Sequence, residues 1–511
     1  MAETQPNILL IMADQLSALA LPSYGHPVVK APHITALAET GVLFENAYCN
    51  SPLCAPSRAS MMTGRLPSRI GAYDNACDFP TSAATMALGL RGQGYRTALC
   101  GKMHFVGPDQ LHGFEERLTP DIYPADFAWV PNWDKPEERI DWWYHNMLSV
   151  KQAGVAEATN QLDYDDEVAF HAVRFLKDYA RSDQVRPFFL AVSFTHPHDP
   201  YAIRKDYWER YDRAAIDLPR VGPIPPERMD PHSRRLRKVS AMDEAEITED
   251  DIRRARRGYY GAIAYVDDHV GELIATLRNF GLEEPTIVLF TSDHGDMLGE
   301  RGLWYKMCFF EWAVRVPLIV AAPTRFAPRR SAAPVSHLDL LPTLLELGVP
   351  ESGRRMDRAG DGASVVPYLE ERPSKERAVL GEYLAEGALA PIFMIRRGRH
   401  KFVWSEPDPP MLFDLESDSD ELLNLAAHPE HAAWVRAFEA EVREHWDPVG
   451  LREAIVQSQR TRRYAFEALS QGRPTSWDYR PVAHGRYVGG DVDLTDLERT
   501  RRFPPPEREQ A

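Results

Sequence analysis

The chain has 511 residues and an ordinary globular composition, with 44% hydrophobic and 26% charged residues. Its formal net charge of −16 argues against a general binder of nucleic acids or anionic membranes, because such a protein needs a broad basic surface. The apolar run before Asp14 is too short for a signal peptide or a membrane span. Five cysteines without a C-x-x-C pair favour neither a disulfide framework nor a structural zinc site, so we predict a cytoplasmic enzyme.

Short apolar runs that end in polar residues alternate with helical stretches along the first part of the chain. The predicted strands cover residues 6–15, 97–105, 187–201 and 286–296, and the predicted helices cover 31–41 and 255–281. This alternation predicts an α/β fold with a mostly parallel central sheet flanked by helices. Residues 218–238, rich in Pro and Arg, are predicted to form surface loops. Ligands of such sheets bind beyond the carboxyl ends of the strands, where the polar residues of this sequence gather.

The pattern changes near residue 371. Short strands joined by turns are predicted within 390–406 and 410–416, followed by an amphipathic helix over 430–446. We therefore predict a catalytic domain over 1–370, an α+β subdomain with a small antiparallel sheet over 371–470, and an extended tail over 471–511. The tail has few apolar runs, so we expect it to lie on a neighbouring subunit of a homo-oligomer, a dimer or tetramer.

Two of the predicted strands end in residues that suit a metal ion. Asp14 ends the first strand, and Asp293 and His294 end the strand over 286–296. Two carboxylates and an imidazole suit a divalent cation, and Gln15 offers a further carbonyl oxygen. A single aspartate in this position is more often a turn or helix cap, but two matching strand ends favour a metal site.

Basic residues gather around the same strand ends. Cys54 and Arg58 lie at the start of a predicted helix, where backbone N–H groups and a guanidinium attract anions. On its own Cys54 reads as a buried thiol. Further basic residues follow the predicted strands or lie near the segment with Asp293 and His294: Lys102, His104, His196, His198 and Lys306. Together they predict a cationic site for a tetrahedral oxyanion such as sulfate or phosphate, and hence metal-assisted ester hydrolysis.

Several sequence blocks resemble a known family. The stretch "CAPSRASMMTGR" matches the sulfatase signature C-x-P-S-R followed by T-G-R. Further sulfatase-like blocks follow in the same order: "GKMH", "SDHGDMLGE", "RVPLIV" and "MLFDLESDSDELLNL". The chain thus resembles the formylglycine-dependent (type I) sulfatases of the alkaline-phosphatase superfamily over nearly its whole length. Longer stretches, such as "GKMHFVGPDQLHGFEERL" and "RIDWWYHNM", are similar to the choline-sulfatase branch.

This resemblance implies that Cys54 is a precursor. A formylglycine-generating enzyme would read the C-x-P-S-R stretch and convert the cysteine to formylglycine, whose hydrate attacks sulfur. The implied ligands of one divalent metal ion are Asp14, Gln15, residue 54, Asp293 and His294. Calcium is the expected ion, with magnesium or manganese as alternatives. Sulfatases commonly carry Asp-Asp where this chain has Asp14-Gln15, which leaves the role of Gln15 open.

The resemblance also implies roles for the basic residues. Arg58, Lys102 and Lys306 would hold the sulfate oxygens and balance the charge of the transition state. Either His198 or Lys306 would protonate the departing alcohol. His104 would then remove the proton whose loss releases sulfate.

The choline-sulfatase branch implies a quaternary ammonium substrate, choline O-sulfate, hydrolysed to choline and sulfate. Aromatic faces and a carboxylate hold such a cation, and the implied pocket residues are Asn75, Trp129, His145, Asn146 and Glu386. Tryptophans in a row are more often core residues. The alternatives are an arylsulfatase or a phosphonate or phosphate monoester hydrolase on the same scaffold, and a non-catalytic sulfatase-like binding protein, against which the intact set of polar residues argues.

Overall fold

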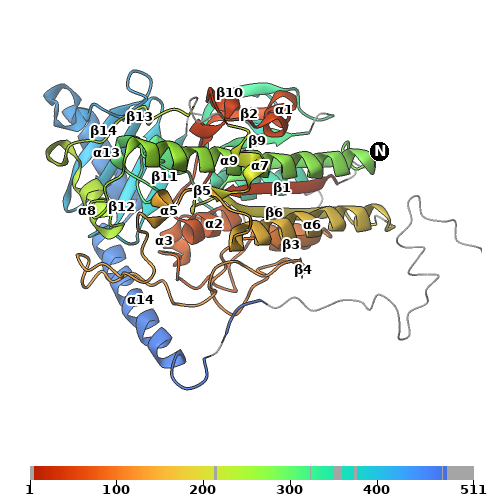
Figure 1. The fold of residues 1–511 in the computed structure, drawn as a ribbon, viewed down its shortest axis with the longest axis horizontal. Helices are drawn as coiled ribbons and strands as arrows, with labels where there is room; N and C mark the ends of the chain where they lie inside the picture. The colour runs from red at the N-terminus through yellow and green to blue at the C-terminus, as the bar shows by residue number, and fades with distance from the viewer. Residues whose placement is uncertain are drawn as a thin grey trace, which may run out of the picture.

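The computed structural model describes residues 5–183, 185–211, 216–322, 324–348, 360–372, 377–474 and 476–479. Its centre is an eight-stranded sheet with the strand order β10-β2-β9-β8-β1-β6-β3-β4 (Figure 1). The strands are β1 (Asn7–Asp14), β2 (Val42–Tyr48), β3 (Arg96–Gly101), β4 (Glu116–Arg117), β6 (Phe188–Pro197), β8 (Thr286–Ser292), β9 (Leu318–Ala321) and β10 (Arg329–Ser336). Only β9 runs antiparallel to its neighbours, which confirms the predicted mostly parallel sheet.

Helices flank this sheet and bury its central strands. Every residue of β1, β6 and β8 is buried, which explains why these strands are continuous apolar runs. In one group, α6 (Asn160–Ala180) and α9 (Glu249–Asn279) pack beside β6, and α1 (Pro32–Thr40) packs on α9 and β9. A second group packs together around α2 (Cys54–Thr63), with α4 (Met86–Arg91) and α11 (Leu340–Gly348).

Short elements connect these helices and strands. The short helices are α3 (Pro67–Ile70), α5 (Leu148–Lys151), α7 (Lys205–Trp208), α10 (Glu311–Val314) and α12 (Val366–Leu369). A two-stranded parallel pair joins β5 (Gly154–Val155) to β7 (Ala202–Ile203). Single turns of 3₁₀ helix lie between several of these elements, among them Glu300–Gly302 and His337–Asp339.

The C-terminal part forms a second, antiparallel sheet, as predicted. Its strands are β11 (Ala378–Tyr383), β12 (Ile392–Arg397), β13 (His400–Ser405) and β14 (Asp408–Asp414). Side chains alternate along β12. Phe393 joins a core with Phe438 of α13 (Ala432–His445), whereas Met394 joins the main core. The small sheet is therefore packed between its own helix and the large domain; the domain boundary at 370/371 stays a prediction.

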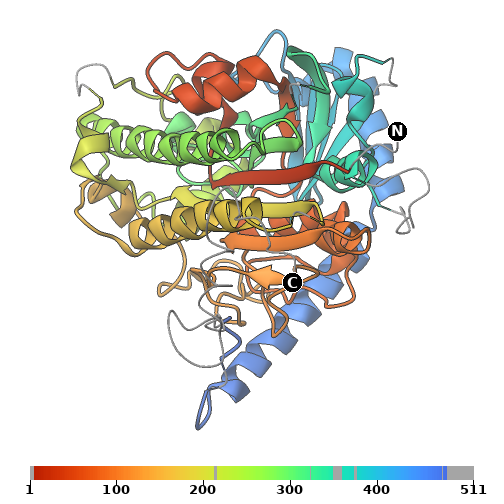
Figure 2. The same ribbon diagram turned by 90° about the vertical axis from the view of Figure 1, so that its right-hand side faces the viewer.

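Two of the helices that were not predicted from the sequence lie in segments with another expectation. Part of the stretch over 218–238, expected to be surface loops, belongs to α8 (Pro231–Val239), whose N-cap Asp230 accepts a hydrogen bond from the Ser233 N–H. The long helix α14 (Pro448–Leu469) follows α13 and projects from the body in both ribbon views (Figures 1 and 2). It was missed because it buries only one narrow face. Residues 480–511 of the predicted tail lie outside the described residues.

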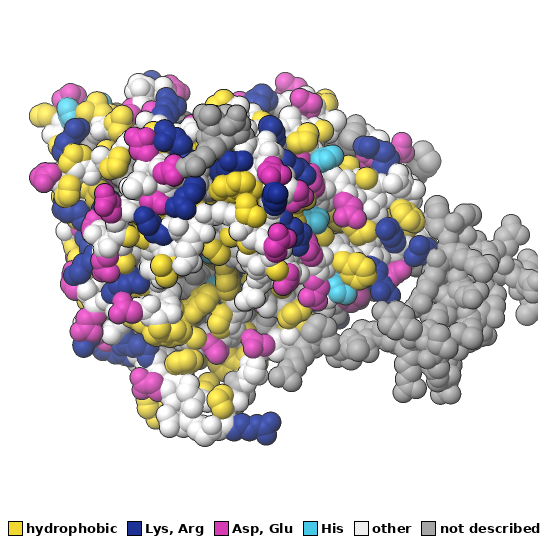
Figure 3. Space-filling view, in the orientation of Figure 1, with side chains coloured by type: hydrophobic (Ala, Val, Ile, Leu, Met, Phe, Trp, Pro, Cys, Tyr) yellow, Lys and Arg dark blue, Asp and Glu magenta, His cyan; other side chains and the backbone are white. Residues whose placement is uncertain are grey.

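On one face of the molecule the surface charge is mixed, and the described helices are not of the membrane-spanning kind. Acidic and basic side chains are interspersed over the face shown in Figure 3. Within the part of the chain that the structure describes, no helix combines the length and the apolar character needed to cross a membrane.

Candidate active site

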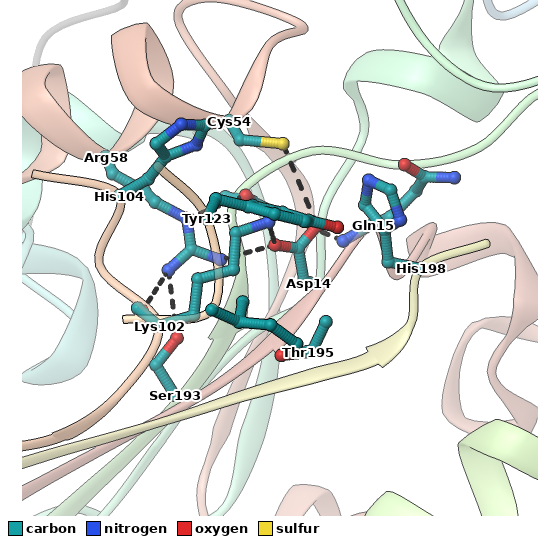
Figure 4. A network of polar contacts seen from close by, with 12 residues as sticks. Asp14, Gln15, Cys54, Arg58, Lys102, His104, Tyr123, Ser193, Thr195 and His198 are labelled. Carbon is teal, nitrogen blue, oxygen red and sulfur yellow. Dashed lines mark hydrogen bonds and ion pairs between the residues drawn. The ribbon is translucent and has the colours of Figure 1, made fainter. Parts of the chain in front are cut away.

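The order of the central strands brings the predicted polar residues together. Strand β1 lies between β8 and β6, and β3 lies on the other side of β6, all of them parallel. Asp14 ends β1, whereas Asp293, His198 and Lys102 directly follow the carboxyl ends of β8, β6 and β3. Figure 4 shows Asp14, Lys102 and His198 converging at this edge of the sheet, with Cys54 beside them. The sheet therefore supplies one functional side chain from each of four neighbouring strands.

Four buried residues form a cluster that fits a metal ion. One ligand atom from each of Asp14, Cys54, Asp293 and His294 lies within 4.8 Å of the others. The Cys54 Sγ atom is 3.2 Å from His294 Nε2 and 4.0 Å from Asp14 Oδ1. Two carboxylates with an imidazole are suitable ligands for a divalent cation. The donor set therefore fits the predicted metal, with residue 54 at its edge.

Arg58 organises the two carboxylates of this cluster. Its side chain is 1% exposed, and it donates from Nη2 to Asp14 Oδ2 and from Nε to Asp293 Oδ2, each at 2.9 Å. Its Nη1 group donates to Ser193 Oγ at 2.9 Å. Burial alone would raise the pKa of Asp293, but the adjacent guanidinium lowers it to about 2. Arg58 thus occupies one oxygen of each carboxylate and leaves Asp14 Oδ1 directed toward Cys54.

A glycine allows Lys102 to reach the same carboxylate. Gly101 has φ 106°, and a Cβ atom at this position would lie 2.1 Å from the Ser193 carbonyl oxygen. Only glycine lets β3 approach β6 so closely in this conformation. The Lys102 ammonium then forms an ion pair with Asp14 inside the protein. Burial opposes the charge of Lys102, yet Asp14 raises the pKa of its ammonium group.

Gln15, which follows Asp14 in the chain, contacts two further buried aspartates, Asp199 and Asp296. Its Oε1 atom accepts a hydrogen bond from Lys306 Nζ at 2.6 Å. Its Nε2 group donates to Asp296 Oδ2 at 2.7 Å and to Asp199 Oδ1 at 3.4 Å. A carboxylate at position 15 would repel both aspartates, whereas an amide can donate to them, which gives a physical reason for glutamine here. Its role as a metal ligand stays a prediction.

His198 and Lys306 form a pair whose proton positions follow from the geometry. His198 Nδ1 lies 2.6 Å from the Asp199 carbonyl oxygen, which can only accept, so Nδ1 carries the hydrogen. The opposite nitrogen, Nε2, then accepts from Lys306 Nζ at 2.8 Å. Burial opposes the charge of Lys306, but Cys54 and Asp199 raise the pKa of its ammonium group. The pair therefore presents a lysine proton next to a neutral imidazole.

His104 is held by its backbone and has a free ring. Its N–H group donates to Asp121 Oδ2 at 2.8 Å, and its φ of 56° marks an uncommon conformation. Both ring nitrogens are buried without a hydrogen-bond partner among the described residues. An unpartnered buried imidazole is costly, so it is a candidate for exchange of a proton with a substrate.

Comparisons with known proteins agree with this geometry. The family model described as Sulfatase matches residues 6–348. This chain belongs to the sulfatase family. Further models match residues 299–447 (N-sulphoglucosamine sulphohydrolase, C-terminal) and residues 453–503 (choline sulfatase enzyme C terminal). The predicted family membership and fold class are thereby confirmed.

Individual relatives of this sulfatase extend over most of its length. It is 48% identical over 515 aligned residues to a choline-sulfatase of Rhizobium meliloti, covering 99% of each chain. It is 28% identical to an arylsulfatase of Clostridium perfringens, over 84% of this chain and 91% of the relative. Among solved structures, phosphonate monoester hydrolase of Agrobacterium radiobacter matches with a TM-score of 0.68 at 25% identity, over 88% of this chain and 96% of the other.

This sulfatase has an aromatic cluster next to His104. The Trp129 ring centroid lies 5.2 Å from Tyr123, 5.8 Å from His104 and 6.4 Å from Trp143. Asn75 lies near residue 54, because its Oδ1 accepts from the Ala55 N–H at 3.0 Å. Trp142, which precedes Trp143 in the stretch "RIDWWYHNM", is 63% exposed and belongs to the surface.

The other predicted pocket residues have different surroundings. His145 stacks on Tyr305 with ring centroids 4.4 Å apart, and burial lowers its pKa to about 3. Asn146 Oδ1 accepts from the Leu148 N–H at 2.8 Å, which caps a local turn. Glu386 is 6% exposed, and its Oε2 atom has no hydrogen-bond partner among the described residues. Burial raises the pKa of Glu386 to about 7, while Lys306 acts in the opposite direction.

Sequence reasoning missed several residues that build this site. The Lys102 ammonium lies over the Tyr123 ring, 4.2 Å from its centroid. Asp199 accepts from Ser149 Oγ at 2.8 Å as well as from Gln15, and Asp296 accepts from the Tyr201 hydroxyl at 2.8 Å. Asp199 was findable, because it directly follows His198 in the chain. Nothing local marks Tyr123 or Asp296.

Proposed function

We propose that this sulfatase hydrolyses choline O-sulfate to choline and sulfate. The full-length similarity to a choline-sulfatase and the match to the choline sulfatase C-terminal model support this substrate. The observation that carries the proposal is the combination of an aromatic cluster and an unpaired buried carboxyl group near the basic residues. Tyr123, Trp129 and Trp143 offer ring faces, and Glu386 offers negative charge. A quaternary ammonium is bound by these groups without hydrogen bonds.

The nucleophile in this proposal derives from Cys54. A formylglycine-generating enzyme converts the cysteine, and the hydrated aldehyde supplies a hydroxyl group that attacks sulfur. Residue 54 is the first residue of the ten-residue helix α2, and the helix dipole favours negative charge at this end. Asp14, Asp293 and His294 would hold a divalent cation, with calcium preferred over magnesium or manganese. When bound there, such a cation would supply Lewis acidity toward the attacking group and would balance negative charge.

The remaining residues handle charge and protons. Arg58 and Lys102 place two positive charges beside Asp14, where the sulfate oxygens would lie. Lys306 and His198 lie within 2.8 Å of each other and would deliver a proton to the departing choline oxygen. His104 has free ring nitrogens and would accept the proton whose removal releases sulfate. An alkyl alcohol is a poor leaving group, so proton donation by the Lys306–His198 pair should account for much of the rate enhancement.

A comparison of substrates tests this function. We expect fully converted protein to turn over choline sulfate with a higher kcat/KM than 4-nitrophenyl sulfate or a phosphonate monoester. The change Trp129→Ala should raise KM for choline sulfate by about tenfold, because it removes a ring face worth about 1–2 kcal/mol. The matched control is Trp142→Ala, since this tryptophan is 63% exposed and should leave KM unchanged.

Two results would contradict the substrate assignment. Faster turnover of aryl sulfates or phosphonates, together with an unaffected Trp129→Ala variant, would favour the arylsulfatase or phosphonate monoesterase alternative. Phosphonate monoesters are included among the test substrates because the fold is similar to that of a phosphonate monoester hydrolase. Converted protein without turnover of any of these esters would favour a non-catalytic binding protein.

The charge of Glu386 gives a prediction about pH. Its carboxyl group has a pKa of about 7, so it is ionised above that pH and increasingly neutral below it. KM for choline sulfate should therefore rise as the pH falls, approaching about tenfold per pH unit well below the pKa. The analogue 3,3-dimethylbutyl sulfate, which keeps the sulfate but lacks the ammonium charge, should not show this rise, and the ratio of the two KM values cancels effects on shared catalytic groups. In Glu386→Gln the ratio should be flat with pH; a ratio that still changes would assign the effect to another group.

A homo-oligomer and a cytoplasmic location complete the proposal. The oligomer rests on the sequence of the tail, because residues 480–511 lie outside the described residues, and the location rests on the small number of cysteines.

A further inference from the structure

The buried face of α14 carries polar side chains. Its buried residues are Ile455, Gln459 and Arg462, spaced so that they share one side of the helix. A helix that serves only as packing material buries apolar side chains on this face. Burial of glutamine and arginine costs free energy unless each finds partners. The partners of these two side chains therefore indicate what the helix supports.

Arg462 binds the loop that carries Asn75. It is 4% exposed, and its Nη1 and Nη2 groups donate to the two oxygens of Asp74 at 2.7 and 2.8 Å. Asp74 is fully buried, and its Oδ1 atom also accepts from the Ala76 N–H at 3.0 Å. Asn75 lies between these two residues, and its own side chain accepts from the Ala55 N–H beside position 54. A planar, two-pronged ion pair fixes direction as well as distance.

Gln459 is connected through hydrogen bonds of Trp133 to the segment that carries Glu386. It is 1% exposed, and its Oε1 atom accepts from the Trp133 N–H at 2.8 Å. The Trp133 indole then donates to the Ala385 carbonyl oxygen at 2.9 Å. Both polar residues on the buried face of α14 thus connect to segments with candidate pocket residues, although they lie more than 300 positions away from Asp74 and Trp133 in the chain.

We propose that Arg462 is a positioning residue that holds Asn75 at the active site through Asp74, with Gln459 supporting the Glu386 segment through Trp133. The inference rests on the proposed function only for the identity of the substrate. Asn75 contacts Ala55, the neighbour of residue 54, where the proposed chemistry places the sulfate group of any ester, so its placement should affect every sulfate ester. The C-terminal helix is then part of the active-site support.

The experiment uses Arg462→Lys in the full-length, converted protein. Lysine keeps a positive charge next to Asp74 but loses the two-pronged contact. We expect kcat/KM to fall by about tenfold, because small displacements of a contacting group have effects of this size or larger. In an Asn75→Ala background, the same change should cause no further fall, since residues that act through one another are not additive. The melting temperature should change by only a few degrees.

A neighbouring arginine on the same helix provides the control. Arg460 forms a similar two-pronged pair with Asp134, at 2.8 and 2.6 Å, on the surface. Arg460→Lys should leave kcat/KM unchanged in both backgrounds. If Arg462→Lys does not fold, Asp74→Asn takes its place in the same cycle, because it keeps the arginine and weakens the pair.

The outcomes separate the inference from the proposed function. Unchanged kcat/KM in Arg462→Lys would overturn the positioning role. An equal fall of kcat/KM when Arg462→Lys is made in the parent protein and in the Asn75→Ala background would overturn it as well. The cycle is measured on both choline sulfate and 4-nitrophenyl sulfate. If the parent protein turns over only the aryl ester and the cycle remains non-additive on it, the substrate assignment fails while the positioning role stands.

Discussion

The change Cys54→Ala is expected to abolish turnover of sulfate esters, with kcat/KM lower by about 10⁴-fold or more, as for loss of a catalytic nucleophile. Residue 54 lies at the start of α2 beside His294 and Asp14, and the proposed function places the attacking group there. Burial would raise the pKa of the Cys54 thiol, but Lys102, Lys306 and His294 bring it well below its usual value. The surroundings thus favour negative charge at this position, and alanine supplies none.

The expected loss must be traced to the modified residue. Protein produced with and without the converting enzyme should have activity in proportion to the fraction of formylglycine in the Cys54 peptide, measured by mass spectrometry. The matched control is Cys308→Ala, because Cys308 is also buried and burial raises the pKa of its thiol to about 12. This control should keep most of its activity. Full activity with an unmodified Cys54 thiol would contradict the proposed chemistry.

The parts of the site at the ends of the strands were predictable from the sequence. Asp14, Asp293 and His198 each follow an apolar run, and parallel strands place such residues at one edge of a sheet. Cys54 and Arg58 were marked by a signature that is local in the chain. In these cases neighbouring residues carry both the structural signal and the chemical one.

Contacts between distant parts of the chain were not predictable in this way. The hydrogen bond from Gln15 to Asp296 joins residues 281 positions apart, and the Arg462–Asp74 pair joins residues 388 positions apart. The tryptophans show the same limit. Trp142 and Trp143 are adjacent and identical in type, yet one is 63% exposed and the other packs on Trp129. Only the packing of the folded chain distinguishes such residues.

The second large effect is expected for Arg58→Lys. The guanidinium donates to Asp14, Asp293, Ser193 and the Lys102 carbonyl oxygen from one buried position. A lysine ammonium is a single point charge and cannot serve both carboxylates in that geometry. An unpaired buried carboxylate costs about 3–5 kcal/mol of unfolding free energy. We expect a loss of this size in urea unfolding measured with a chelator present.

The fate of the two carboxylates also determines the effect on catalysis. Arg58 fixes one oxygen of Asp14 and one of Asp293. Its loss leaves Asp14 held by Lys102 and Asp293 held by backbone N–H groups, which loosens the alignment of both carboxylates with residue 54, so kcat/KM should fall by about 10²–10³-fold. The matched control is Arg210→Lys, which alters a two-pronged pair with Asp268 that is more than a third exposed. It should cost less than about 1 kcal/mol and leave kcat/KM unchanged. Equal losses of stability in the two variants would mean that the buried network does not depend on the guanidinium. Added calcium should restore part of the stability of Arg58→Lys, because a divalent cation compensates the same two carboxylates from their other side.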